Sequence, residues 1–207
     1  MRIILSILLL SVCYPTVINV PEDYSTIQES IDASSTGDTV LISSDIYYES
    51  IDFLSKNITV AGEYINSGIQ ADIMQTVIYN ISTLPTVTFG DAGQNNDARL
   101  VGISIYSENT GIEINNSDAT IERCLLYNPL HGSGILCNSS SPNIINCTIA
   151  GFDNAIFSDG GSNPDINSSI LWSESSGIVG SGSVKYSCIR DGFNCSFTDL
   201  GQHFIGE

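Results

Sequence analysis

A repeat of about 22 residues restricts the fold of this chain more than any other feature of its sequence. Four segments in the C-terminal half align on one isoleucine each, and these isoleucines are 23, 21 and 22 residues apart. Two more columns of aliphatic residues run in the same order. The columns are Ile112, Ile135, Ile156 and Ile178; Leu100, Ile121, Ile144, Ile166 and Val184; and Ile105, Leu126, Ile149, Leu171 and Ile189. Three columns with one period predict a solenoid in which each repeat stacks on its neighbour.

Each repeat contains short β-type runs separated by residues that favour turns. In one repeat the runs are residues 135–137, 143–145 and 147–149, and Asn146 forms the corner between the last two. Asparagine suits a corner because it tolerates the left-handed backbone region. Three short strands per period predict a parallel β-helix, in which equivalent residues of successive coils lie about 4.8 Å apart. Leucine-rich and helical repeats are excluded because neither a Leu-x-x-Leu-x-Leu frame nor a 3.6-residue stripe recurs.

The N-terminal half contains similar β-rich runs at a less regular spacing, at residues 39–43, 57–61, 76–79 and 86–89. Ahead of them, residues 25–33 have the pattern of a short amphipathic helix. Ser25 and Gln28 have the spacing of a capping box. Ile27 and Ile31, four residues apart, would lie on one helical face. A helix in this place is expected to cover the open hydrophobic end of the solenoid.

Two parts of the sequence point to a known family. The first is INVPEDYSTIQESID at residues 18–32, continued by GDTV at 37–40, IYYESI at 46–51 and KNITV at 56–60; the second is SPNIINCTI at 141–149. They resemble the opening and the short repeat of pectin-lyase-like right-handed parallel β-helix proteins. The resemblance implies an all-β, single-stranded, right-handed helix with three sheets. It does not choose among functions, because this fold hosts lyases, hydrolases, esterases, epimerases and inert stalks.

The sequence therefore divides into four parts. We expect a signal peptide at residues 1–13, a cap segment with the short helix at 14–36, a parallel β-helix of about seven coils at 37–193, and a C-terminal segment at 194–207. In similar sequences the run around Cys188 leads into a further segment. The chain is therefore expected to be truncated before a further coil or cap.

The first 13 residues have the features of a secretory signal. A short basic start, Met1-Arg2, precedes an apolar stretch of about eight residues, which is too short to span a bilayer. Small residues at positions 11 and 13 suit cleavage after Cys13, and lipid modification of Cys13 is the alternative. No other apolar run is long enough to cross a membrane. We therefore expect a mature chain that is secreted or held at the cell surface without direct membrane insertion.

A formal net charge of −17, from 23 acidic and six basic residues, limits the partners of the chain. It excludes a protein that binds the phosphate backbone of nucleic acids, because too few cations are present to displace counterions. It also argues against docking on an anionic membrane surface. An acidic polymer would be repelled unless a divalent cation bridged it to the protein.

The search for a catalytic site yields two candidates. The short motifs that mark the sites of pectate lyases, polygalacturonases and pectin methylesterases are absent from this sequence. A lyase needs a strong base and a cation beside the sugar carboxylate. Among the few basic residues, Arg123 and Lys185 fall at repeat positions and are the candidates for these roles. The alternative is that both are surface charges of their coils.

The acidic loop residues suggest a calcium site between coils. Asp153 and Asp159 flank one predicted strand and could meet carboxylates of neighbouring coils about 5 or 10 Å away. No EF-hand loop and no Gly-Gly-x-Gly-x-Asp repeat is present. The alternative interpretation is that both are solvated loop acids.

Aromatic residues suggest a platform for sugars. The position after the third strand of each coil holds Tyr127, Ala150, Trp172 and Arg190 in succession, so Tyr127 and Trp172 are about 10 Å apart. His131 and Phe152 lie in the adjacent loops. Aromatic rings suit the C–H face of a sugar, and the resemblance implies that the polysaccharide cleft runs along this side. The alternative is that Trp172 packs on its own loop.

The cysteines occupy different places in the repeat. Cys124 and Cys147 share one inward column and predict a stacked pair of buried thiols. Cys137 is expected to point inward from another strand. Cys188 points outward and is followed seven residues later by Cys195, so Cys188–Cys195 is the best candidate for a disulfide. No Cys-x-x-Cys is present, and a zinc site is not expected.

These features favour an exported, non-catalytic β-helix module that binds extracellular polysaccharide along the side of Tyr127 and Trp172. Two alternatives remain open. One is a polysaccharide-degrading enzyme of the pectin-lyase-like class, either a calcium-assisted lyase or a glycoside hydrolase. The other is a purely structural spacer. The leading interpretation requires no cofactor, and the protein is expected to be a monomer or part of a longer multidomain chain.

Overall fold

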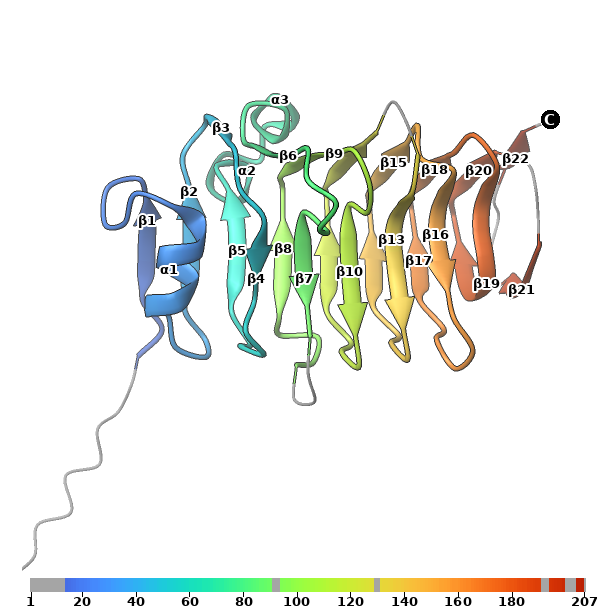
Figure 1. The fold of residues 1–207 in the computed structure, drawn as a ribbon, viewed down its shortest axis with the longest axis horizontal. Coiled ribbons are helices and arrows are strands. Elements are labelled where there is room, and N and C mark those ends of the chain that lie inside the picture. Colours follow the sequence, from blue (N-terminus) through green and yellow to red (C-terminus); the bar gives the residue numbers. More distant parts are fainter. Residues whose placement is uncertain (1–13, 91–93, 129–130, 191–193, 200–203, 207) are drawn as a thin grey trace, which may run out of the picture.

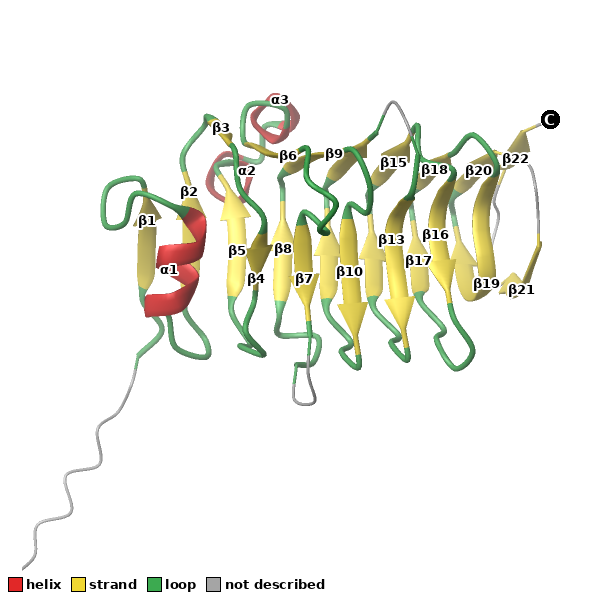
Figure 2. Ribbon diagram, in the orientation of Figure 1, coloured by secondary structure: helices red, strands yellow, loops and turns green. Residues whose placement is uncertain are grey.

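The computed structural model describes residues 14–90, 94–128, 131–190, 194–199 and 204–206. Its strands wind around one axis as a right-handed parallel β-helix, which confirms the predicted fold (Figure 1). The signal peptide predicted at residues 1–13 lies outside the described residues. Figure 2 shows that the helices of the described chain are confined to its N-terminal half, where they sit beside the strands rather than between them.

Three faces form the solenoid, and each is named by its first strand. The β1 face consists of β1 (Val17–Val20), β2 (Thr39–Ile42), β5 (Thr59–Gly62), β8 (Arg99–Val101), β11 (Thr120–Glu122), β14 (Asn143–Ile145) and β17 (Asp165–Asn167). The β3 face consists of β3 (Ile46–Tyr47), β6 (Val77–Asn80), β9 (Ser104–Ser107), β12 (Leu125–Tyr127), β15 (Thr148–Ala150), β18 (Ile170–Trp172), β20 (Cys188–Arg190) and β22 (Phe204–Gly206). The β4 face consists of β4 (Ile51–Asp52), β7 (Val87–Phe89), β10 (Ile112–Asn115), β13 (Ser133–Asn138) and β16 (Asn154–Ser158).

Two strands and three helices complete the described chain. The long strand β19 (Ser176–Lys185) runs from the β4 face into the β1 face and pairs with both β16 and β17. The strand β21 (Asn194–Asp199) pairs with β19. The helices are α1 (Ile27–Ala33), α2 (Tyr64–Ser67) and α3 (Gln70–Ile73).

The three aliphatic columns predicted from the sequence stack as expected. Like residues of neighbouring coils meet in the pairs Ile121–Ile144 and Ile144–Ile166 on the β1 face, Leu126–Ile149 on the β3 face, and Ile135–Ile156 on the β4 face. All of these side chains are fully buried. The core is therefore a continuous file of apolar residues along the axis, and each coil buries its apolar surface against the coils on either side.

A short corner joins the β1 face to the β3 face. One residue of the corner adopts a left-handed backbone with φ between +50° and +64°, at Gly102, Arg123, Asn146, Ser168 and Tyr186. The N–H group of Asn146 donates to the carbonyl of Asn167 in the next coil, and Arg123 and Ser168 make the equivalent bond. The corner predicted at Asn146 is confirmed. Arg123 and Tyr186 adopt the left-handed conformation with more strain than Gly102 or Asn146. The packing of the neighbouring coils must therefore stabilise the backbone at these two positions.

The helix α1 closes the N-terminal end of the solenoid, as predicted. Ile27 and Ile31 are fully buried and belong to the core. The cap differs from the prediction by one residue, because Thr26 and not Ser25 is the N-cap. Thr26 Oγ1 accepts the N–H group of Glu29 at 3.1 Å, and Ser25 Oγ donates to the Glu29 carboxylate at 2.8 Å. Hydrogen bonds from the side chains of Ser25 and then Thr26 to the Glu29 carboxylate lower the pKa of Glu29.

An insertion that contains α2 and α3 separates β5 from β6, and the sequence pattern did not reveal it. It lies against the outside of the corner, beside the β3 face (Figure 1). Gly102 permits this approach, because a Cβ atom there would come within 2.7 Å of Tyr64 Cβ. Ser104 Oγ donates to the carbonyl of Ile73 at 2.8 Å and ties α3 to the start of β9.

The solenoid continues beyond residue 193, where the sequence predicted its end. The backbone of β21 pairs with β19 and that of β22 pairs with β20, so both strands extend the stack. The fold therefore has about eight turns and not about seven. None of the helices in the described ranges has the length and the apolar composition needed to cross a bilayer.

Candidate functional site

A row of aromatic side chains runs along the outside of the β3 face. Tyr79, Tyr106 and Tyr127 occupy equivalent positions in β6, β9 and β12. Tyr48, just after β3, lies against Tyr79, with 5.3 Å between the ring centroids. The next centroid distances along the row are 4.3 Å and 6.1 Å. Trp172 continues the row two coils beyond Tyr127. We call these five residues the aromatic row.

The sequence predicted Tyr127 and Trp172 as members of this row and missed the other three. The insertion of α2 and α3 interrupts the repeat, so the period alone does not align the earlier coils. A signal was nevertheless present, because Tyr106 directly follows Ile105 of an aliphatic column, as Tyr127 follows Leu126. Neighbouring residues of a strand point to opposite sides, so each such tyrosine must point outward.

Two neighbouring rings of the aromatic row cover each other, whereas Tyr48 meets Tyr79 edge-on. Tyr79 and Tyr106 stack with 4° between their planes, so their faces meet along the solenoid axis. Tyr127 leaves this stack, because its ring is tilted by 54° from that of Tyr106. The stacked tyrosines thus stabilise adjacent coils, whereas Tyr127 offers part of its ring surface to solvent.

The aromatic row has a gap at Ala150. This residue pairs with Tyr127 on one side and Trp172 on the other, which separates the two aromatic residues by about 10 Å. Tyr127 is 47% exposed and Trp172 is 44% exposed. Tyr127 leans toward the gap, since its Cε2 atom lies 3.4 Å from the place of a Cβ atom at Gly151. The guanidinium carbon of Arg190, one coil further along, lies 5.3 Å from the centroid of the Trp172 ring.

The two loop residues predicted beside the row differ in exposure. The side chain of His131 is 83% exposed, in the loop after β12. Phe152 is fully buried in the core, so the prediction that it binds substrate is wrong. The physical reason is the left-handed backbone of Gly151, with φ of +80°, which interrupts the in–out alternation of β15 and turns Phe152 inward.

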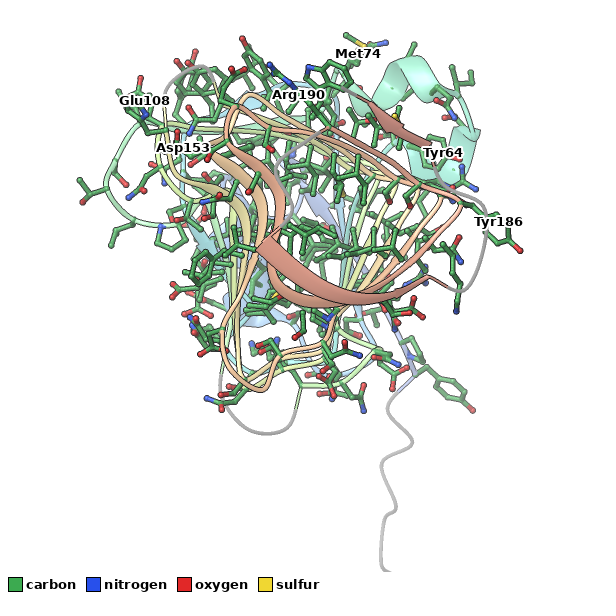
Figure 3. The ribbon with its side chains drawn as sticks, turned by 90° about the vertical axis from the view of Figure 1, so that its right-hand side faces the viewer. Tyr64, Met74, Glu108, Asp153, Tyr186 and Arg190 are labelled. Carbon is green, nitrogen blue, oxygen red and sulfur yellow. The ribbon has the colours of Figure 1, made fainter. Side chains whose placement is uncertain are left out.

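Charged side chains follow one edge of the β3 face. Figure 3 looks along the solenoid and shows Glu108 and Asp153 at this edge, with Arg190 over the face and the insertion at the opposite edge. Asp153 Oδ1 lies 3.4 Å from His131 Nδ1. Arg190 Nη1 lies 3.7 Å from Glu174 Oε1. The imidazole of His131 and the guanidinium of Arg190 each lie within 4 Å of a carboxylate.

The negative charge near the row also affects its phenols. The pKa of Tyr106 is raised, first by burial, then by its contacts with Tyr79 and by the charge of Glu108. Near the start of the row, burial and the charges of Asp45, Glu22 and Glu49 raise the pKa of Tyr47 to about 12. The surroundings of the aromatic row thus disfavour a further negative charge.

The two aspartates predicted to bind calcium lie at opposite ends of β16 and do not share a site. Asp153 accepts the N–H group of Gly132 at 3.1 Å, in addition to its contact with His131. Asp159 accepts the N–H group of Ser139 and the hydroxyl of Ser162, each at 2.9 Å. In the part of the chain that the structure describes, no three His, Cys, Asp or Glu side chains gather to hold a metal ion. Calcium binding stays a prediction.

The candidate catalytic cations Arg123 and Lys185 lie apart from the aromatic row and from each other. Arg123 Nε is 3.4 Å from the Glu122 carboxylate, and its guanidinium carbon is 5.4 Å from the centroid of the Tyr64 ring. Lys185 Nζ is 3.7 Å from the Asp165 carboxylate. In the register of the β1 face, Lys185 lies three coils from Glu122, which is about 14 Å along the axis. The two cations do not form one site.

Arg123 also lines a pocket of about 280 Å³ between α3 and the corner. Gln70, Met74 and Leu125 line the same pocket, and none of its described lining residues carries a carboxylate or an imidazole. Proton abstraction from a sugar needs a base of suitable pKa at that place. The pocket therefore holds a cation without an evident acid–base partner.

Comparison with solved structures relates this arrangement to known proteins. The pectin methylesterase of Aspergillus niger, in two forms that differ in deglycosylation, matches with a TM-score of 0.50 and 16% identity, over 92% of this chain and 83% of that one. The pectin methylesterase PemA of Erwinia chrysanthemi matches with a TM-score of 0.47 and 11% identity, over 89% and 80% of the two chains. The chain has the pectin-lyase-like fold. At such identities the likeness concerns the fold alone. No protein-family model and no curated protein matches the sequence.

Inside this pectin-lyase-like solenoid, the buried cysteines stand where they were predicted. Cys124 and Cys147 stack in one inward column, and each Sγ donates to the carbonyl two residues earlier at 3.4 Å. Ser169 Oγ makes the equivalent bond in the next coil at 3.0 Å. The thiols therefore act as hydrogen-bonding corner residues. Burial raises the pKa of Cys124, and burial and then the charge of Asp159 raise that of Cys137 to about 12.

The disulfide predicted between Cys188 and Cys195 is not tested by the structure. Cys188 lies partly exposed in β20, on the β3 face. Cys195 lies in β21, which pairs with β19 on another part of the solenoid, and its side chain lies outside the described residues. The pairing stays a prediction.

We expect Cys188 to react with iodoacetamide in the native protein when a reductant is present, and Cys124, Cys137 and Cys147 to react only after unfolding. The thiolate is the reactive form, and burial disfavours it at Cys124 and Cys137, while the burial of Cys147 keeps the reagent away from its sulfur. Mass spectrometry of the alkylated peptides, with and without a reductant, measures this. Labelling of Cys137 in the folded chain would contradict its burial. Labelling of Cys188 only after reduction would support the disulfide.

Proposed function

We propose that this protein is an exported, non-catalytic module that binds extracellular polysaccharide along the β3 face. The observation that carries the proposal is the aromatic row, which places one ring on each of several successive coils. An extended polysaccharide also repeats one ring after another along a line. Aromatic side chains combine a flat apolar face with a polar edge, which suits contact with sugars.

Both ends of the aromatic row offer accessible surface. Tyr127 and Trp172 are nearly half exposed on either side of Ala150. At the other end, a recess of about 540 Å³ is lined by Tyr48, Tyr79, Ile81 and neighbouring polar residues, among them the acidic Glu49. A ligand could thus extend over several coils, and each added contact would contribute to the binding free energy.

Two further observations support export and the absence of catalysis. The signal-like residues 1–13 suit export. The candidate cations Arg123 and Lys185 belong to the corner and to the β1 face, where each is paired with a carboxylate. A substrate bound on the aromatic row would not reach either of them in a common geometry. A test for unsaturated products on a panel of uronic-acid polymers should therefore show no activity.

The experiment that tests the proposal compares Trp172→Ala with Tyr186→Ala in binding to immobilised polysaccharides. Tyr186 is an exposed aromatic residue of the corner, outside the aromatic row, and serves as the matched control. We expect Trp172→Ala to weaken binding by about tenfold, equivalent to roughly 1.4 kcal/mol, and Tyr186→Ala to leave it unchanged. Equal effects of the two changes would contradict the proposed site. Failure of the unaltered protein to bind any polysaccharide would favour a structural spacer.

A further inference from the structure

The outward surface of β12, β15 and β18 carries no charged side chain. The outward positions of these three strands hold Leu125 and Tyr127, Thr148 and Ala150, and Ile170 and Trp172. We call these six residues the neutral strip. Ile170, at 45% exposure, is as accessible as the two aromatic residues. The neutral strip thus spans three coils of a chain whose net charge is −17.

The charges beside the neutral strip offer little to an anionic ligand. The guanidinium of Arg123 lines a pocket with Leu125 and Thr148 of the strip and lies 3.4 Å from the Glu122 carboxylate. The guanidinium of Arg190 contacts Glu174 and covers one side of the Trp172 ring, and the imidazole of His131 contacts Asp153. Each arginine beside the strip in the described chain is therefore matched by a carboxylate. Glu108 adds a further negative charge at the same edge, and it contributes to the raised pKa of Tyr106.

A polyuronate would meet two penalties on this surface. Its carboxylates would lose water against apolar side chains without gaining a hydrogen-bonded cation in exchange. They would also approach the carboxylates at the edge of the β3 face, and like charges at short range repel. A polysaccharide without charge would meet neither penalty and would bury its C–H faces against the neutral strip.

We infer that the ligand of the β3 face is an uncharged polysaccharide, with one sugar ring placed over Ala150 between Tyr127 and Trp172. This inference rests on the proposed function and specifies the class of polysaccharide. The gap at Ala150 provides the place, because the small side chain leaves about 10 Å between the two exposed aromatic residues. The tilt of Tyr127 out of the tyrosine stack turns its ring toward that place.

The test uses two polymers that share a backbone and differ in charge, polygalacturonate and its fully methyl-esterified form. Binding to the unaltered protein is measured by isothermal titration in the presence of a chelator, so that no divalent cation bridges the acidic polymer. A neutral β-glucan serves as an unrelated uncharged probe. We expect the methyl ester or the glucan to bind at least about tenfold more tightly than polygalacturonate, with little dependence on salt.

The outcomes separate the inference from the proposed function. Binding of polygalacturonate as tight as that of the uncharged polymers would overturn the inference and leave polysaccharide binding in place. Absence of binding to all three polymers, extended to a broad panel of glycans, would overturn the proposed function and the inference with it. Binding of uncharged polymers alone supports both.

A charge placed in the gap provides a second test. Ala150→Lys should raise the affinity for polygalacturonate relative to its methyl ester by about tenfold, because a cation then stands in the neutral strip. Ala150→Gln, with a side chain of similar reach and no charge, is the matched control and should leave the ratio unchanged. An unchanged ratio in a folded Ala150→Lys protein, as judged by its thermal midpoint, would contradict the placement of the sugar over Ala150.

Discussion

Replacement of Phe152 with alanine is expected to lower the free energy of unfolding by about 3–5 kcal/mol. The side chain is fully buried and is among the largest in the core. Its ring packs against the backbone of neighbouring coils, where Cβ atoms at Gly111 and Gly134 would lie only 3.4 and 3.3 Å from it. Since these two positions carry no side chain, they contribute nothing that could fill the cavity that the ring leaves. Chemical denaturation measures the loss.

Trp172→Ala is the control for this change, because Trp172 is a large aromatic residue on the outside of the same solenoid. At 44% exposure it should cost less than about 1 kcal/mol of stability. The two changes therefore separate packing from binding, since Phe152→Ala should reduce stability and Trp172→Ala should reduce affinity. A Phe152→Ala protein with unaltered stability and lost polysaccharide binding would restore Phe152 to the binding site.

Replacement of Gly134 with alanine is expected to cost about 3 kcal/mol, at the upper end of the usual penalty for overpacking. An added Cβ atom would lie 2.3 Å from Ile149 Cγ2 and 2.6 Å from the carbonyl oxygen of Ala155 in the next coil. Ile149 is fully buried and β-branched, so it cannot rotate away, and the carbonyl belongs to the backbone of β16. The coils must therefore separate locally. The thermal midpoint and denaturant titration measure the effect.

Gly160→Ala is the matched control for Gly134→Ala. No atom lies within 4 Å of a Cβ at this position, and its backbone is not left-handed. The change should be neutral or slightly stabilising, because it reduces the freedom of the unfolded chain. Equal stability of the two variants would show that neighbouring coils can separate at β13 without a measurable penalty.

The sequence predicted the fold through residues whose environment recurs in every coil. Ile121, Ile144 and Ile166 meet one after another because each is the inward residue of the same strand in successive coils. The corner at Asn146 was predictable for the same reason. The insertion of α2 and α3 was not predictable, since its residues repeat nothing. The N-cap lies one residue from its predicted place, since Ser25 and Thr26 are both able to cap and Thr26 does so.

The candidate site was predicted where a strand carried its residues and missed where a loop or an insertion intervened. Tyr127 and Trp172 follow inward aliphatic residues in regular strands, so their outward direction follows from alternation alone. The same rule fails for Phe152, because Gly151 has a left-handed backbone. The charge of the site also depends on tertiary contacts. The sequence gives no indication that Arg190 is shared between Glu174 and the Trp172 ring.

Because the residues of the aromatic row are separated by whole coils, the length of this surface depends on how many coils the gene encodes. Duplication of a segment of about 22 residues would lengthen the surface by one step and leave its other steps unaltered. Loss of the segment that carries Ala150 would instead bring Tyr127 and Trp172 onto adjacent coils and close the opening between them. Under the proposed function, specificity for ligand length would evolve by adding or removing whole segments, without any substitution in the residues of the aromatic row.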